Sequence, residues 1–205
     1  MMMVRYASGH KQESLARITQ AAGRGFRKQG FGGIGVDGLA KEAGVTHGAF
    51  YGHFRSKSEA FKAAVVAGLR QLSDGIVAKR EKDGAGWVAP FVEFYLGYKR
   101  TCDLGDACTV PVLSPEIERA DVTTRTAYEA ELRKVIEALA AGFANGSDAE
   151  REARAWVLMS LLSGGVTLAR AVPSAELSAA ISTAVSSAAL RIAGDSNAAT
   201  SPGVL

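Results

Sequence analysis

Residues 38–61 read GLAKEAGVTHGAFYGHFRSKSEAF, and this stretch decides the fold of the first quarter of the chain. Gly44 supplies the left-handed residue that a tight corner between two short helices requires. Thr46 follows the corner, and its hydroxyl can cap the free amides of a second helix. Phe50 and Phe54 are four residues apart, so both lie on the inner face of that helix. The pattern predicts a helix-turn-helix, whose second helix can enter a major groove.

The same stretch resembles the tetracycline-repressor (TetR) family of one-component bacterial regulators. The resemblance rests on the Ala-Gly-Val-Thr run of residues 43–46, the Gly-Ala-Phe-Tyr run of residues 48–51, and the His-Phe pair with the following Lys-Ser-Glu in residues 53–59. It is close up to about residue 65 and is limited to a general all-helical plan beyond that point. The resemblance implies a dimeric transcriptional regulator, mostly a repressor, that leaves a palindromic operator in double-stranded DNA when a small-molecule effector enters its second domain.

Six residues of the predicted head are candidates for contact with DNA. Those with small or hydrogen-bonding groups on the outer face, expected at base edges, are Thr46, His47 and Ala49. Those able to donate hydrogen bonds to phosphate oxygens are Tyr51, His53 and Lys57. The alternative is a helical corner with a solvated basic face.

Positive charge is concentrated in the first 57 residues, which hold nine Lys or Arg against three Asp or Glu. The rest of the chain holds 15 bases against 18 acids, although the whole chain has a net charge of +3. This division predicts that only the first quarter is a surface for a polyanion.

Length and composition favour an all-α fold with one small domain and one larger domain, and the resemblance implies that these are an N-terminal three-helix helix-turn-helix DNA-binding head and a C-terminal helical domain for effector binding and dimerisation. The chain has 205 residues, of which 47% are hydrophobic, and strand-like alternation is hard to find. The expected boundaries are 1–57 for the head, 58–194 for the helical domain and 195–205 for a disordered tail. The helices expected from periodicity and glycine or proline breaks are 10–29, 56–79, 87–101, 121–143, 148–171 and 175–193, with an irregular connection over 101–115.

No stretch has the apolar length of a signal peptide or of a membrane span, so a soluble cytoplasmic protein without membrane contact is expected. Cys102 and Cys108 do not make a disulfide scaffold, and the cysteines and histidines lack zinc spacing. We therefore expect no metal and no cofactor.

Aromatic residues recur at helical spacing in the first helix of the second domain and could line an effector pocket. Pockets for small molecules have mostly apolar walls with a few polar groups. The candidates, with three residues of later helices as opposing walls, are Phe91, Phe94, Tyr95, Tyr98, Tyr128, Trp156 and Met159. The alternative is that such a stripe is plain core.

Small residues recur at spacings of three and four on the last two helices. They let helices approach closely, and two such helices that meet their own copies form a four-helix interface of a homodimer. The candidates are Ser160, Gly164, Thr167, Ala180, Ala184 and Ala188. The alternative is packing within one subunit.

Other classes of function have weaker support in the sequence. A thiol or redox sensor acting through Cys108 is one alternative, but Asp103 and Asp106 nearby would raise the pKa of that thiol, which favours a buried, inert cysteine. An enzyme is not expected, because all three histidines lie in the head and no base accompanies a nucleophile. A helical adapter whose head docks a protein is the remaining alternative.

Overall fold

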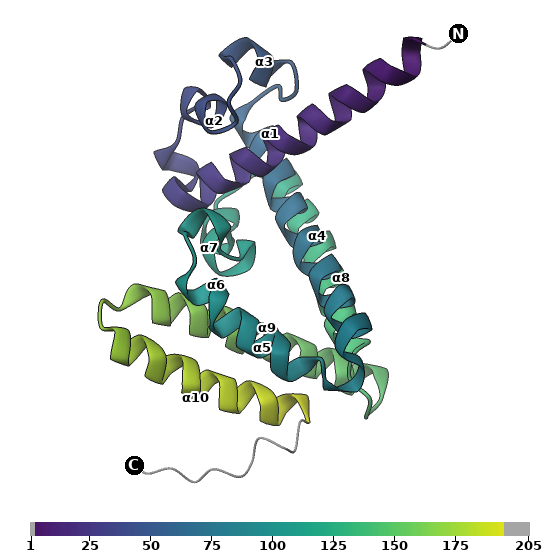
Figure 1. The fold of residues 1–205 in the computed structure, drawn as a ribbon, viewed down its shortest axis with the longest axis vertical. Coiled ribbons are helices and arrows are strands. Elements are labelled where there is room, and N and C mark those ends of the chain that lie inside the picture. The colour runs from purple at the N-terminus through teal and green to yellow at the C-terminus, as the bar shows by residue number, and fades with distance from the viewer. Residues whose placement is uncertain (1–2, 195–205) are drawn as a thin grey trace.

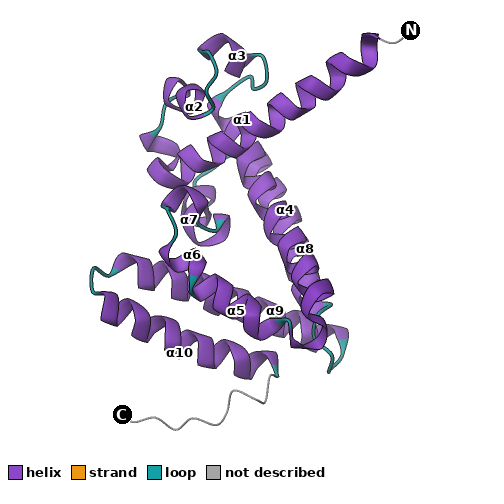
Figure 2. Ribbon diagram, in the orientation of Figure 1, coloured by secondary structure: helices purple, strands orange, loops and turns teal. Residues whose placement is uncertain are grey.

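The computed structural model describes residues 3–194, and every regular element within them is a helix (Figures 1 and 2). The predicted all-α class is therefore confirmed for this range. The tail predicted over 195–205 lies outside the described residues. No helix that the structure describes combines the length and the apolar character that a transmembrane span requires.

The head consists of α1 (Met3–Gly33), α2 (Val36–Glu42), α3 (His47–Tyr51) and the first turns of α4 (Lys57–Asp83). Its core is built from side chains that are fully shielded from solvent, namely Ile18, Ala22, Phe26, Leu39 and Phe50. Helix α1 begins earlier than the sequence indicated. Its predicted end near residue 29 is marked by Gly30, whose φ of 73° interrupts the helix before one further turn.

Helix α4 links the head to the rest of the molecule, which we call the body (Figure 1). Near its start, the Phe61 ring packs edge-on against Phe26 at 5.0 Å between ring centroids. Further along, Leu69 and Ile76 are buried in the body, where α8 (Val122–Ala140) runs beside α4. One helix thus serves both units, and the boundary after residue 57 stays a prediction.

The body differs from the sequence expectation between residues 87 and 117. The single helix expected over 87–101 is divided at Gly97 into α5 (Val88–Leu96) and α6 (Tyr98–Thr101), after a short 3-10 turn, η1 (Gly84–Gly86). The prediction of an irregular connection over 101–115 is wrong, because this range contains a second 3-10 turn, η2 (Leu104–Asp106), and most of α7 (Thr109–Ile117). Pro111 is tolerated there because it lies in the first turn of α7, where amides have no partner within the helix.

The last two helices pack against each other at the end of the body opposite the head (Figure 1). They are α9 (Asp148–Ala171) and α10 (Ala175–Ala193), and both spans agree with the sequence prediction. Ser147 caps α9 with a capping box, in which the Ser147 hydroxyl accepts a hydrogen bond from the amide of Glu150 and the Glu150 carboxylate accepts one from the amide of Ser147.

Candidate functional site

The corner between α2 and α3 has the geometry that its sequence predicts. Gly44 has a φ of 63°, which few residues other than glycine adopt without strain. The Thr46 hydroxyl accepts a hydrogen bond from the backbone amide of Ala49 at 3.1 Å and caps α3. The two helices therefore meet at a fixed angle with the start of α3 pointing outward.

The outer face of α3 is open and its inner face is anchored. Phe50 and Phe54 are buried, with ring centroids 5.3 Å apart. Thr46, His47 and Ala49 are all exposed. A side chain at Gly48 would meet no atom within 4 Å, so the backbone itself is accessible at this point. The structure thus brings the three base-edge candidates together on one exposed face.

The sequence analysis missed the partner of His47. Nδ1 of His47 lies 2.5 Å from a carboxylate oxygen of Asp37 on α2. Because an ionised carboxylate only accepts hydrogen bonds, Nδ1 carries the proton in this contact, and Nε2 makes no hydrogen bond with residues 11–194. The His47 ring also lies 4.9 Å from the ring of Tyr51. Asp37 thereby orients a side chain expected at base edges.

The three phosphate candidates differ in how free they are. Tyr51 is 46% exposed at the end of α3. Nε2 of His53 lies 3.3 Å from the hydroxyl of Ser14, which ties the residue to α1. The ammonium of Lys57 lies 4.5 Å from the centroid of the Phe31 ring, a cation–π contact that competes with a phosphate.

The basic residues of the head divide into two groups, a distinction the sequence did not reveal. The exposed group, whose members form no ion pair with residues 11–194, contains Lys11, Arg17, Lys41 and Arg55. The other group faces the body at the end of α1 and contains Arg24, Arg27 and Lys28. The positive surface available to DNA is therefore smaller than the net charge of the head suggests.

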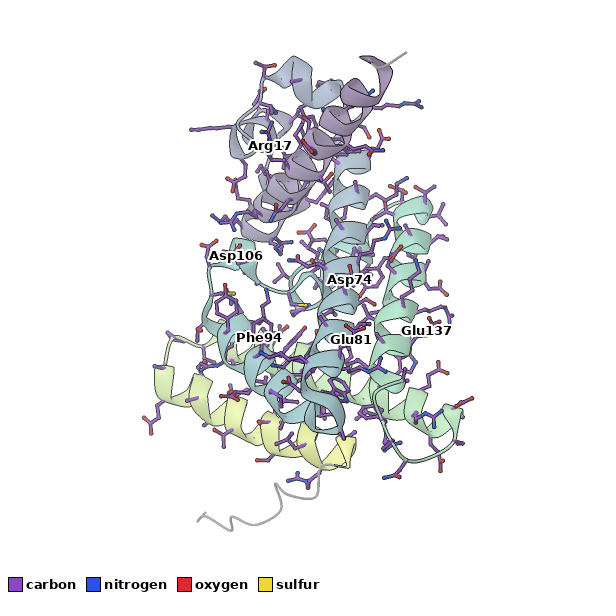
Figure 3. The ribbon with its side chains drawn as sticks, turned by 45° about the vertical axis from the view of Figure 1, so that its right-hand side comes forward. Arg17, Asp74, Glu81, Phe94, Asp106 and Glu137 are labelled. Carbon is purple, nitrogen blue, oxygen red and sulfur yellow. The ribbon has the colours of Figure 1, made fainter. Side chains whose placement is uncertain are left out.

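The turn η2, whose Asp106 is labelled in Figure 3, contacts α1 and engages this second group. Arg24 forms an ion pair with Asp106 and reaches Glu42 of α2 at 3.7 Å. Nε of Arg27 donates to the carbonyl of Gly105 at 2.7 Å. Lys28 lies 3.3 Å from Asp103. Contacts from α1, α2 and η2 thus meet at one junction between head and body.

Hydrogen bonding stabilises the charge of Asp103 at this junction. Its carboxylate accepts a bond from the amide of Gly105 at 3.0 Å, and this bond, together with the nearby Lys28, lowers the pKa of Asp103. The ionised carboxylate of Asp103 therefore faces Lys28 of α1 at neutral pH.

A cavity of about 420 Å³ lies in the body between α4 and α5. Three predicted pocket residues line it: Phe91, Phe94 and Tyr95. The opposing wall belongs to α4, and the remaining lining comes from α6 and the start of α7. These further residues, none of them predicted, are Gly68, Gln71, Leu72, Gly75, Lys79, Lys99, Cys108 and Thr109.

The other four pocket candidates lie elsewhere. Tyr98 is 52% exposed and stacks on Phe94 at 5.5 Å. The Tyr128 hydroxyl is 2.7 Å from that of Ser114, in a separate groove between α7 and α8. Trp156 lines a charged groove between α8 and α9, and Met159 is buried in the core. Tyr128, Trp156 and Met159 were predicted to form the opposing wall of the pocket. This prediction is wrong, because residues of α4 form the wall that faces α5.

Cys108 is buried, as the sequence analysis expected, but for a different reason. Burial raises the pKa of its thiol, whereas Asp103 and Asp106, which were expected to do so, are engaged by cations of α1. A buried thiol with a raised pKa carries little thiolate at neutral pH, which disfavours the redox-sensor alternative.

The small residues expected at a dimer interface lie on the surface of the subunit. Ser160, Gly164, Thr167, Ala180 and Ala184 are exposed, and Ala188 is half-buried. The contact between α9 and α10 uses other residues, because a side chain at Gly165 would lie 2.8 Å from Val185. Leu168 and Leu177 add apolar surface on these two helices, with exposures of 60% and 50%.

Comparison with known proteins identifies the head. Residues 18–64 match the family model described as bacterial regulatory proteins of the tetR family. The chain is 36% identical over 81 residues to the HTH-type transcriptional regulator TtgR of Pseudomonas putida, an alignment that covers 40% of this chain and 38% of TtgR. It is 41% identical over 59 residues to the regulator AcrR of Shigella flexneri, covering 29% of this chain and 27% of AcrR.

The curated relatives are thus matched over less than half of their length, whereas a solved structure is similar over nearly the whole chain. The reduced form of E. coli NemR superposes with a TM-score of 0.70 at 20% identity, covering 84% of this chain and 95% of NemR. At this identity the likeness shows the fold. The matched head and the described helices together make this chain similar to the bacterial regulatory proteins of the tetR family, with residues 18–64 as the part that matches the family model.

Proposed function

We propose that this protein is a homodimeric transcriptional repressor that binds a palindromic DNA operator and leaves it when a small molecule occupies the body cavity. The observation that carries the proposal is the exposed face of α3, with Thr46, His47 and Ala49 outward over the buried rings of Phe50 and Phe54. A short capped helix of this kind, braced by a second helix, can be inserted into a major groove.

The exposed faces of α9 and α10 support the dimer. Gly164 has no side chain and faces open space, since a side chain there would meet no atom within 4 Å. A partner helix could therefore approach closely at this point. Exposed Val157, Leu168 and Leu177 offer apolar area beside it. A two-fold pair of these faces would join two subunits, each with its own head, as a palindrome requires.

The junction at η2 supports a coupling between cavity and head. Lys99 lines the cavity and donates to the carbonyl of Asp106 at 2.7 Å. The carboxylate of the same Asp106 pairs with Arg24 on α1. A ligand that favours one arrangement of this turn would therefore favour one placement of the heads relative to successive grooves. We propose binding, with no catalytic step, at this site.

DNA binding is tested by fluorescence anisotropy with duplexes from the DNA upstream of the protein's own reading frame, and with shuffled duplexes of the same composition. We expect preference for one native duplex and a steep loss of affinity as salt rises from 50 to 200 mM. Arg55→Glu should abolish binding, whereas Arg125→Glu, an equal charge reversal on the exposed face of α8, should not. A flat salt response, or equal losses in both variants, would refute the head as the contact surface.

A further inference from the structure

The charged groups that line the body cavity are of one sign. Lys79 and Lys99 line it, and no Asp or Glu of the described chain does so. Lys79 is neutralised by Asp83 at 3.1 Å. Lys99 has no carboxylate partner among residues 11–194, and its ammonium is held by the carbonyl of Asp106 and by the faces of Phe94 and Tyr98 at 5.7 and 5.5 Å. The cavity thus presents one cation that lacks a counter-ion.

A second cation lies behind the wall of the cavity. Arg27 is partly buried, and its guanidinium donates to the carbonyl of Gly105 and, at 3.5 Å, to the hydroxyl of Thr109, which lines the cavity. Burial lowers the pKa of Arg27, and the nearby carboxylate of Asp106 offsets part of this effect. The guanidinium thus places a second positive charge beside Thr109.

The cavity also holds a buried hydrogen-bonding group without a partner. The hydroxyl of Tyr95 is buried in the wall and makes no hydrogen bond of good geometry within the described chain, although the thiol of Cys108 faces it. A buried hydroxyl without a partner is destabilising in general, so a ligand oxygen within reach of it would be favoured. Lys99 and Tyr95 both line the cavity.

The lining of the cavity favours an apolar, aromatic body. A side chain at Gly75 of α4 would meet no atom within 4 Å, whereas a side chain at Gly68 would clash with Thr109, so α4 and α7 are in close contact at that end. The rings of Phe91 and Phe94 form the opposite wall. A cavity of about 150 Å³ holds one benzene ring, so the volume of about 420 Å³ here accommodates two or three rings. Phe94 lies in the body below Asp106 of the junction (Figure 3).

We propose that the body cavity binds a small organic carboxylate with a flat, aromatic body, whose charge pairs with Lys99 and whose rings lie between α4 and α5. The inference names the chemical class of the effector and rests on the proposed function for its regulatory consequence. Lys99 also holds the carbonyl of Asp106, whose carboxylate pairs with Arg24. Ligand binding and docking of the head therefore share one residue.

The ligand class is tested on the full-length protein without DNA, by calorimetric titration with three probes that share one ring system. The probes are 2-naphthoate, neutral 2-naphthamide and the cation 2-naphthylmethylammonium. We expect the acid to bind at least about 10-fold more tightly than the amide, because a charge-assisted hydrogen bond replaces a neutral one, and the cation to bind most weakly. Acid that binds no better than amide, or fails to bind at millimolar concentration, would overturn the proposal.

Variants assign the preference to one side chain. Lys99→Met should lower the affinity for the acid by about 10- to 100-fold and change the affinity for the amide by less than about threefold. Lys99→Arg should restore the affinity for the acid. Lys82→Met is the matched control, since Lys82 is an exposed lysine of α4 that does not line the cavity, and it should change the affinity for neither probe by more than about threefold. An unchanged preference in Lys99→Met would overturn the assignment. If that variant does not fold, the probe series on the unaltered protein still decides the ligand class.

The test separates this inference from the proposed function. Probe binding is measured without DNA, so a protein that prefers the acid but never binds its upstream duplexes would refute the repressor and leave the ligand class standing. A protein that binds its operator yet shows no preference for the acid would refute the ligand class alone. Gly75→Leu, which fills the slot between α4 and α5, should weaken all three probes together, and undiminished binding would place the ligand elsewhere.

Discussion

The head and the body of this protein differ in how the residues of their functional sites are distributed along the sequence. In the head, one stretch of about twenty residues holds the corner, the cap, the exposed face and the buried anchors of α3. In the body, the cavity is assembled from α4, α5, α6 and α7, whose contributing residues lie between positions 68 and 109. The head can therefore be identified from local sequence, whereas the body cavity requires the packed structure.

The largest contrast is expected from one chemical change made in each region. Phe50 and Phe91 are both buried, with exposures of 0% and 4%. Truncation of either to alanine should lower the free energy of unfolding by about 3–5 kcal/mol. Phe50→Ala should also abolish DNA binding, because it removes the anchor beneath α3, whereas Phe91→Ala should retain it and enlarge the cavity. Urea unfolding and anisotropy measure the two effects, and retained DNA binding in Phe50→Ala would contradict the contrast.

Several features of the head follow from short-range physics, which explains why they could be predicted. A hydroxyl before a helix caps it, and a glycine at a corner takes a positive φ, whatever the rest of the chain does. Thr46 and Gly44 behave in this way. The contact between Asp37 and His47 spans two helices, so sequence periodicity gave no sign of it.

The body shows the limit of periodicity as a guide. The aromatic stripe of α5 was identified, yet Phe94 and Tyr98 are exposed while Tyr95 is buried. The packing of α4 determines which residues face the aromatic stripe. Two of these residues are glycines, which do not contribute to an apolar pattern in the sequence, so α4 was not predicted as a wall of the pocket. Lys99 was overlooked because its significance depends on the absence of a carboxylate neighbour, which only the fold determines.

The next contrast lies within α3. His47→Ala should remove a contact to a base edge and lower the preference for the native duplex by about 1–3 kcal/mol. Tyr51→Ala should lower the affinity for native and shuffled duplexes alike, because a phosphate contact carries no sequence information. Anisotropy with both duplexes separates the two. Equal losses on native and shuffled DNA for both variants would contradict the assignment of His47 to base edges.

The two groups of basic residues in the head make a finer comparison. Arg55 is exposed after α3, whereas Arg24 is engaged with Asp106 and Glu42. Arg55→Ala should reduce the slope of log affinity against log salt by about 0.9 for each phosphate contact that is lost. Arg24→Ala should leave the slope unchanged and instead weaken the response of DNA binding to the ligand. The slope is obtained from anisotropy at four or more salt concentrations, and an equal change in both variants would show that Arg24 faces DNA.

The smallest effects are expected from two helix caps, one in each region. Thr46→Ala should lower the free energy of unfolding by about 1 kcal/mol, by the same amount at every pH, since a hydroxyl does not titrate in this range. Asp121 caps α8, and its hydrogen bonds from Thr123 and the Thr124 amide lower the pKa of its carboxyl to about 2. The folded pKa lies below the unfolded value of 3.8, so this stabilisation is complete above about pH 5 and is lost as the pH falls toward 2. Asp121→Asn should therefore be destabilising near neutral pH, and its difference from the unaltered protein in urea unfolding should shrink in acid. A difference independent of pH would show that the charge of Asp121, unlike the hydroxyl of Thr46, contributes nothing to its cap.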